Sequence, residues 1–419
     1  KNALARKAEE HMTKTKNALS GDKNTFFPVQ QTLFYVVVTA LSVMISTNGC
    51  KQPTVGTQKE QTESTGGTIS FTETEVKHAK GFSIEYTGDH KILKIVNHFG
   101  SRTDTLAYAL VQRGRPAPDG FEKSHVIEIP VRNVVGMSSL QIAMADFLNS
   151  SEVITGLASF KYVSSSKLRE RIKQGKVQEV GEEGTINSEA IIAMGPDLVM
   201  AMGNPSASFS RYQTLIDAGI PVILVSEWLE HTPLGRAEWV KLMAALLNKE
   251  ELVNKKFAAI EAEYKRLAEI GRNAPVKPSI IVGMPYKGSW FVPDGTSFMT
   301  CFFKDAGASY AWYNTKGTGS MGMSFESVAP IALKADYWIN CGTADTKADI
   351  ASRDQRYTYF RPYKNNTIYN FNKKVNDLGS NDYWESGVVN PHLVLSDLIK
   401  ILHPELLPAH SLVYYKQIL

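Results

Sequence analysis

The order of predicted elements constrains this fold most, because strands and helices alternate in two series and one long helix separates them. The predicted strands of the first series are Ile92–Asn97, Val131–Gly136, Val153–Leu157, Leu198–Met202 and Val222–Val225. The predicted helices between them are Ser139–Leu148, Ser165–Gln174, Ser188–Met194 and Ser208–Ala218. Strands separated by single helices are joined by right-handed crossovers and pair in parallel. The first series therefore predicts an amino-terminal α/β lobe over residues 82–248.

The long helix is predicted from Lys249 to Ile270. Asn248 is a favourable residue for its amino-terminal cap, and Gly271 and Pro275 stop it. Its apolar residues recur at helical spacing, at Leu252, Phe257, Ile260, Tyr264 and Leu267. A helix of about 22 residues spans roughly 33 Å, which is long enough to join two lobes. We therefore assign residues 249–271 to a linking helix.

The second series predicts another lobe over residues 272–419. Its predicted elements are Ser279–Met284, Ser297–Asp305, Glu326–Leu333, Tyr337–Cys341 and Thr367–Asn370, followed by a helical region over Asp382–His403. The expected fold is thus α/β, with two parallel-sheet α/β lobes joined by a single long helix and a ligand cleft between the lobes.

The amino-terminal residues have the pattern of an export signal. Residues 1–31 are polar and Lys-rich, and the apolar run Leu33–Ile45 is shorter than the roughly 20 residues of a transmembrane helix. The following Thr47-Asn48-Gly49-Cys50 resembles a bacterial lipobox, although Leu is usual where Thr47 stands. We expect a signal peptide over residues 1–49, lipidation of Cys50 and a flexible tether over residues 50–81. The alternative is a short buried strand before a free cysteine.

Two segments repeat one scheme of helix, tight turn and strand. They are Ser188–Met200 and Phe325–Ile339, and the second contains two additional residues. Glu189 and Glu326 stand at the helix starts, and an Asp precedes each strand.

At these segments the sequence resembles the class III periplasmic binding proteins that serve cobalamin, haem and ferric-siderophore importers. The resemblance covers residues 92–407 and is most specific at the two repeats, at Trp290–Ser297 and at the linking helix. Pro293-Asp294-Gly295 stands where the family usually has Pro-Gly-Gly. The resemblance implies two lobes with modest opening and closing. It also implies a periplasmic or cell-surface, membrane-anchored lipoprotein that delivers a metal chelate to an ABC permease dimer with ATPase subunits.

The resemblance also assigns a role to Glu189 and Glu326. In the family, one surface Glu on each lobe docks into arginine pockets of the permease dimer, where charge-assisted contacts define the register. The alternative is that each Glu complements the dipole of its own helix.

Ligand contacts are expected from loops at the carboxyl ends of the parallel strands. Aromatic side chains are dense in these loops and suit a large planar or chelated ligand. The candidate ligand-binding residues are Arg132, Tyr162, Trp228, Tyr286, Trp290, Trp312 and Trp384. Trp290 is the foremost of them, because it precedes a turn in the family segment. The alternatives are that the aromatic residues pack into the lobe cores and that Arg132 pairs with a neighbouring Glu.

Several other classes of protein are not favoured. The net charge of +4 comes from scattered Lys and Arg residues, which does not favour nucleic-acid binding. The three cysteines include no Cys-x-x-Cys pair. Gly-x-Ser-x-Gly and Walker motifs are absent from the sequence. The glycine-rich segment Gly317–Gly322 follows Trp312-Tyr313 and does not lie between a strand and a helix start, as a phosphate-binding loop would. We therefore expect neither an enzyme nor a cofactor.

Two alternative functions stay open. The nine His residues show no His-x-His or His-x3-His pair, but a cluster of His98, Glu227 and His231 would make a metal-ion-binding two-lobed protein. A surface scavenging lipoprotein that passes a chelate to another receptor is the second alternative. Aromatic richness fits a corrin or porphyrin, whereas a catecholate siderophore favours clustered Arg and Lys.

Overall fold

The computed structural model describes residues 71–99, 102–182, 184–203 and 209–419. The expected signal peptide, Cys50 and the first part of the tether lie outside these residues. Within them, the structure contains no helix that is both long and apolar enough to cross a membrane.

The amino-terminal lobe is built on a parallel sheet, as the sequence predicts. Its strand order is β7-β6-β5-β8-β9, and every neighbouring pair is parallel. The strands are β5 (Val134–Gly136), β6 (Ile154–Leu157), β7 (Gln178–Glu179), β8 (Leu198–Met202) and β9 (Val222–Val225). The helices between them are α2 (Ser139–Phe147), α3 (Ser166–Lys173), α4 (Ser188–Met194) and α5 (Gln213–Asp217). The apolar residues of β8 and β9 are almost all buried, which is why these strands read clearly in the sequence.

A second sheet of this lobe comes before β5 in the chain and differs from the predicted strand–helix alternation. Strands β1 (Phe82–Tyr86), β2 (His90–Phe99) and β3 (Arg102–Gln112) form an antiparallel meander, and β4 (Val126–Ile129) pairs with β3 in parallel. In β2, Leu93 and Ile95 are fully buried whereas Lys94 is partly exposed, so one face of the sheet covers the core. The sequence analysis found part of β2 and missed β1, β3 and β4.

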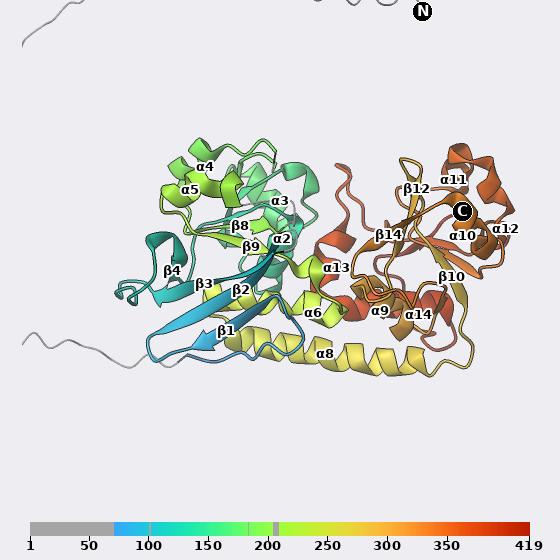
Figure 1. Ribbon diagram of the computed structural model, residues 1–419, viewed down its shortest axis with the longest axis horizontal. Helices are drawn as coiled ribbons and strands as arrows, with labels where there is room; N and C mark the ends of the chain where they lie inside the picture. The colour runs from blue at the N-terminus through green and yellow to red at the C-terminus, as the bar shows by residue number, and fades with distance from the viewer. Residues whose placement is uncertain (1–70, 100–101, 183, 204–208) are drawn as a thin grey trace, which may run out of the picture. The chain divides into compact units, whose positions relative to one another are not determined.

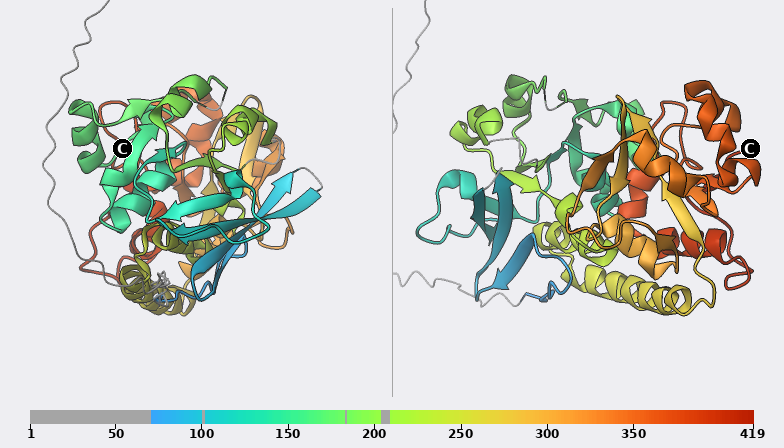
Figure 2. Two further views of the ribbon diagram at one scale, coloured as in Figure 1. Left: turned by 90° about the vertical axis from the view of Figure 1, so that its left-hand side faces the viewer. Right: turned by 45° about the vertical axis from the view of Figure 1, so that its right-hand side comes forward.

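The linking helix is α8 (Glu250–Arg272), which runs below both lobes in Figures 1 and 2. Its buried face includes Phe257, Tyr264 and Leu267, at helical spacing. It packs against α7 (Val240–Leu247) of the amino-terminal lobe and against α9 (Phe298–Asp305) and α14 (Pro391–Leu402) of the carboxy-terminal lobe.

The amino-terminal end of α8 corrects one prediction. Asn248 does not cap α8: it ends α7 in the left-handed conformation, with φ 53°, and Lys249 holds the cap position. Asn tolerates this conformation better than most residues, which suits it to a helix end. Its side-chain oxygen accepts a hydrogen bond from Lys91 Nζ at 2.8 Å.

The carboxy-terminal lobe contains a second sheet, with strand order β13-β10-β15-β16-β17. The strands are β10 (Ser279–Val282), β13 (Ser309–Tyr310), β15 (Tyr337–Ile339), β16 (Ile368–Asn370) and β17 (Lys416–Gln417), of which β17 is antiparallel. A smaller antiparallel sheet comprises β11 (Pro285–Tyr286), β12 (Ser289–Pro293) and β14 (Ser320–Met323). Helices α10 (Phe325–Ala332), α11 (Lys347–Arg353), α12 (Arg361–Lys364) and α13 (Ser386–Val389) complete the lobe.

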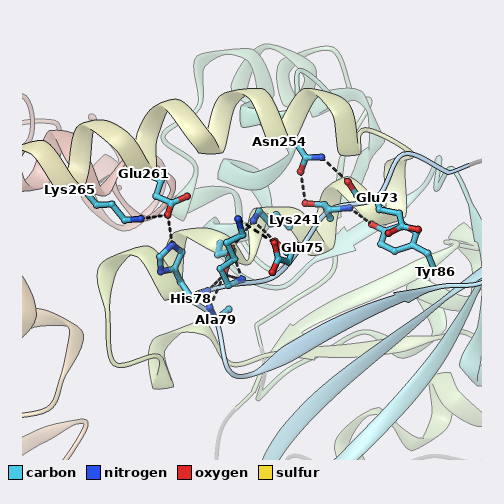
Figure 3. Close-up of polar contacts among 12 residues, drawn as sticks. Glu73, Glu75, His78, Ala79, Tyr86, Lys241, Asn254, Glu261 and Lys265 are labelled. Atoms are coloured by element: carbon cyan, nitrogen blue, oxygen red, sulfur yellow. Dashed lines mark hydrogen bonds and ion pairs between the residues drawn. The ribbon is translucent and has the colours of Figure 1, made fainter.

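The segment 71–81, which we call the strap, lies between α8 and the short helix α6 (Pro233–Glu238) (Figure 3). Thr74 Oγ1 donates to Asn254 on α8 at 2.6 Å, and His78 Nε2 lies 3.0 Å from Glu261 Oε1. Buried carboxylates fix the rest of the strap, because Glu238 accepts the backbone N–H groups of residues 77–79 and Glu230 accepts those of residues 80 and 81. The last part of the expected tether is thus bound to the lobe.

Candidate ligand site between the lobes

A pocket of about 740 Å³ lies between the lobes, beyond the carboxyl ends of β5, β15 and β16. Open α/β sheets bind ligands at this edge. Both lobes contribute to its wall. The amino-terminal lobe supplies Met137, Ser138, Ser139 and Tyr162, and the carboxy-terminal lobe supplies Gly342, Thr343, Asp345, Phe371, Asn372, Val375, Gly379, Ser380, Asn381 and Trp384.

Two predicted aromatic residues, Tyr162 and Trp384, line this pocket. Their side chains are partly exposed, at 48% and 43%. Trp384 ends the short helix η7 (Asp382–Trp384), and its ring packs edge-on against Phe371, with ring centroids 5.3 Å apart. The ring is therefore supported from behind while part of its surface stays free for a ligand.

The remaining wall combines polar residues with Met137, Phe371 and Val375 and carries little charge. Ser138 and Gln141 form a capping box at the start of α2, which fixes Ser138 in the wall of the pocket. Asp345 is the only carboxylate among the described residues of the wall, and Lys416 lies 2.8 Å from it. The described wall contains neither Lys nor Arg. Such a surface suits a ligand that is held by apolar contact and hydrogen bonds.

Three other predicted aromatic residues lie outside this wall. Trp228 is at the carboxyl end of β9, and its indole N–H donates to the carbonyl of Gly203 at 2.8 Å. Trp312 packs edge-on against Tyr310, with centroids 5.3 Å apart. Tyr286 is 64% exposed on the small antiparallel sheet. The structure does not bring these three side chains to the pocket with Tyr162 and Trp384.

The structure corrects the prediction for Trp290. Its side chain is fully buried in the carboxy-terminal lobe, stacked on Trp338 with ring centroids 5.9 Å apart. Its indole N–H donates to the carbonyl of Val282 at 2.8 Å. Successive residues of a strand face opposite sides. In β12, Trp290 and Val292 therefore point into the core of the carboxy-terminal lobe, while Phe291 points outward. Trp290 has no surface that a ligand can contact.

Arg132 lies at the other end of its strand. The sequence places a strand from Val131, but β5 begins at Val134, so Arg132 precedes the strand instead of following it. Its backbone N–H donates to Asp197 Oδ2 at 2.6 Å. The pocket is at the carboxyl end of β5, and Arg132 therefore does not contribute to it.

The sequence analysis missed the pocket residues that directly follow the predicted strand Thr367–Asn370 and those in the loop 375–381. Phe371 and Asn372 come directly after this strand, and Asn372 donates to Asp345 Oδ1 at 2.7 Å. The rule that ligands lie beyond strand ends points to these two residues. The loop 375–381 carries no comparable signal, because its approach to the pocket depends on its contacts with the other lobe.

Glu189 and Glu326 are both exposed in the first turns of their helices. Asn187 and Ser324 cap these helices, each accepting a backbone N–H three residues later. Each helix leads into a parallel strand of its sheet, and this connection places the helix start at the carboxyl edge of the sheet. The two Glu residues therefore lie at the same edges as the pocket.

The Asp residues of the two repeats are also equivalent. Asp197, before β8, accepts backbone N–H groups that lead into β5 and pairs with Arg113 at 2.6 Å. Asp336, before β15, accepts the backbone N–H of Ser279 at 2.7 Å and pairs with Arg361. The Asp residue of the internal repeat thus makes equivalent hydrogen bonds in both lobes, because each accepts a backbone N–H near the start of a neighbouring strand.

Of the suggested metal cluster of His98, Glu227 and His231, the side chain of His98 lies outside what the structure describes. Glu227 and His231 are among the described residues. Across the part of the chain that the structure describes, no group of three or more His, Cys, Asp and Glu side chains is placed to hold a metal ion. Glu227 pairs with Arg236 at 3.1 Å, and His231 Nδ1 lies 3.1 Å from the carbonyl of Thr296 in the other lobe.

Comparisons with known proteins agree with this architecture. An uncharacterized lipoprotein of Methanocaldococcus jannaschii is 27% identical over 292 residues, which cover 67% of each chain. A second lipoprotein of that organism, also uncharacterized, is 23% identical over 408 residues, or 92% of this chain and 99% of the relative.

Solved structures share the fold at low identity. A possible iron-binding, periplasmic solute-binding protein of Staphylococcus epidermidis has a TM-score of 0.51 and 15% identity, covering 65% of this chain and 99% of that one. The triscatecholate siderophore binding protein of Bacillus subtilis has a TM-score of 0.50 and 17% identity, covering 67% and 95%. Residues 148–374, over half of the chain, match the family model described as periplasmic binding protein. The chain therefore belongs to the periplasmic binding protein family.

Proposed function

We propose that this chain is the extracytoplasmic solute-binding lipoprotein of an ABC importer, and that it captures a metal chelate between its lobes for delivery to the permease. The observation that carries the proposal is the pocket of about 740 Å³, to which both lobes contribute side chains. A ligand held from two sides keeps the lobes together, and a permease that separates the lobes releases it.

The volume and chemistry of the pocket support a chelate as the ligand. A space of this size is within the range of small-molecule sites and much larger than a bare ion requires. The aromatic rings of Tyr162, Phe371 and Trp384 supply flat apolar faces. A wall without Lys or Arg among its described residues offers no countercharge to a polyanion. We infer that a corrinoid, haem or weakly charged iron-siderophore fits better than a triscatecholate.

Ligand titration tests the proposal directly. We expect cyanocobalamin, haemin or a neutral ferric hydroxamate to quench tryptophan fluorescence saturably. Removing the ring of Trp384 in W384A should weaken the binding by about tenfold or more, because a supported aromatic contact is lost. The matched control is W228F, which changes a Trp outside the described wall of the pocket. A chain that binds none of these chelates saturably contradicts the proposal.

A further inference from the structure

A buried carboxyl group of one lobe binds backbone N–H groups of the other. Glu385 lies between η7 and α13 in the carboxy-terminal lobe and is 2% exposed. Its Oε2 accepts the N–H of Ser164 at 2.8 Å, and its Oε1 accepts the N–H of Ser165 at 2.7 Å. Both serines belong to the amino-terminal lobe, immediately before α3. These hydrogen bonds must break if the lobes separate here.

Neighbouring contacts join the same two segments. Ser164 Oγ lies 2.8 Å from Ser380 Oγ, and Asn376 Nδ2 donates to the carbonyl of Val163 at 2.8 Å. Ser139 Oγ donates to the carbonyl of Trp384 at 3.2 Å. Ser380 and Trp384 line the ligand pocket, so this junction directly adjoins it.

The surroundings of Glu385 are charged on both sides of the junction. Asp146 on α2 and Lys167 on α3 come from the amino-terminal lobe, and Lys374 and Asp382 come from the carboxy-terminal lobe, around a cavity of about 580 Å³. Burial raises the pKa of Glu385 to about 8, and the negative charges of Asp382 and Asp146 add to the rise. The N–H groups of Ser164 and Ser165 act in the opposite direction and only partly offset it.

We propose that Glu385 is a proton-dependent latch that holds the two lobes together beside the ligand pocket. Separation of the lobes exposes the carboxyl group to water, where its pKa returns toward 4.5. The joined arrangement therefore binds one more proton than the separated one over the interval between these values. Because the pKa is raised in the joined state, the contribution of the latch is complete below about pH 4.5 and is lost as pH rises through about 8.

Hydrogen–deuterium exchange of the ligand-free protein tests the latch without reference to any ligand. The readout is the protection of a peptide covering residues 163–168, corrected for intrinsic exchange at each pH. In the wild type, we expect protection to fall by up to tenfold per pH unit between about pH 5 and pH 8. E385Q imitates the neutral acid, so its protection should not follow this pH dependence. E385A should lose protection at every pH.

The control for a general change in charge is E405Q, at an exposed position of the same lobe. It should keep the wild-type profile. A wild-type profile that does not change with pH, or an identical profile in E385Q, would overturn the proposal. If E385A unfolds, E385Q still decides the outcome, since its amide oxygen retains an acceptor for one of the two serine N–H groups. The exchange experiment uses the ligand-free protein, so its result does not depend on whether any chelate binds in the ligand titration.

Discussion

At the scale of single residues, Lys91 carries a charge in the interior of the amino-terminal lobe. Its side chain is fully buried, and Nζ donates to the carbonyl of Ala245 and to Asn248, both at 2.8 Å, and to Glu250. Burial lowers the pKa of Lys91 and raises that of Glu250, although each partner offsets the effect on the other. Lys91 thereby joins strand β2 to the end of α7 and the start of α8.

This buried pair predicts unequal effects for single and double substitutions. K91M leaves Glu250 buried without its cation and should lower the free energy of unfolding by about 3–5 kcal/mol. The double variant K91M/E250L removes both charges and should recover most of that loss. Urea denaturation followed by circular dichroism measures both. Equal destabilisation by the single and the double variant would show that the effect comes from packing rather than from an unpaired charge.

At the scale of elements, the strap has a firm attachment to α6 and α7 through one acid. Glu238 is fully buried and accepts the backbone N–H of Lys77 at 3.0 Å and that of Ala79 at 2.8 Å. Lys241 also donates to it at 2.7 Å. Burial alone would raise the pKa of Glu238, but these hydrogen bonds outweigh burial and lower the pKa. The carboxylate form therefore contributes stability at neutral pH, which is lost as pH falls below about 4.5.

Removing this acid should release the strap. In E238A the N–H groups of residues 77–79 lose their acceptor, and we expect trypsin to cleave after Lys77 and Lys80 on the order of 10–100-fold faster. Mass spectrometry of timed digests identifies these sites. E73A is the matched control, because the Glu73 side chain is exposed and the contact of Glu73 with Asn254 is made by its backbone carbonyl. Similar cleavage rates in E238A and wild type would contradict the attachment.

Burial explains why some strands are easier to predict from the sequence than others. Strands β8 and β9 are buried on both faces, so each appears as a continuous apolar run. The meander strands follow one another without an intervening helix. The sequence analysis looked for strands separated by helices, and this pattern does not indicate the meander. Trp290 and Trp384 are both aromatic residues in the expected lobe, but strand register and distant contacts place one inside and one at the pocket.

At the scale of the whole molecule, the two lobes present equivalent parts around the ligand site. The described wall of the pocket comes from both lobes, and the helix–strand repeats with their Asp hydrogen bonds occur once in each. This equivalence explains how Glu189 and Glu326, far apart in the sequence, both come to the carboxyl edge of a sheet. A partner with paired arginine sites would engage both carboxylates with a defined register.

If Glu189 and Glu326 dock to the permease, their removal should lower uptake without weakening ligand binding. E189A and E326A should each lower uptake of a bound chelate about tenfold in cells, and the double variant should lower it further, because each removes one charge-assisted contact. The purified variants should bind the chelate with unchanged affinity, since neither Glu lines the pocket. The control is E152A, an exposed acid on η2 (Ser151–Val153) at the opposite, amino-terminal edge of the sheet. Unchanged uptake in the double variant would exclude permease docking through this pair and favour transfer to another receptor.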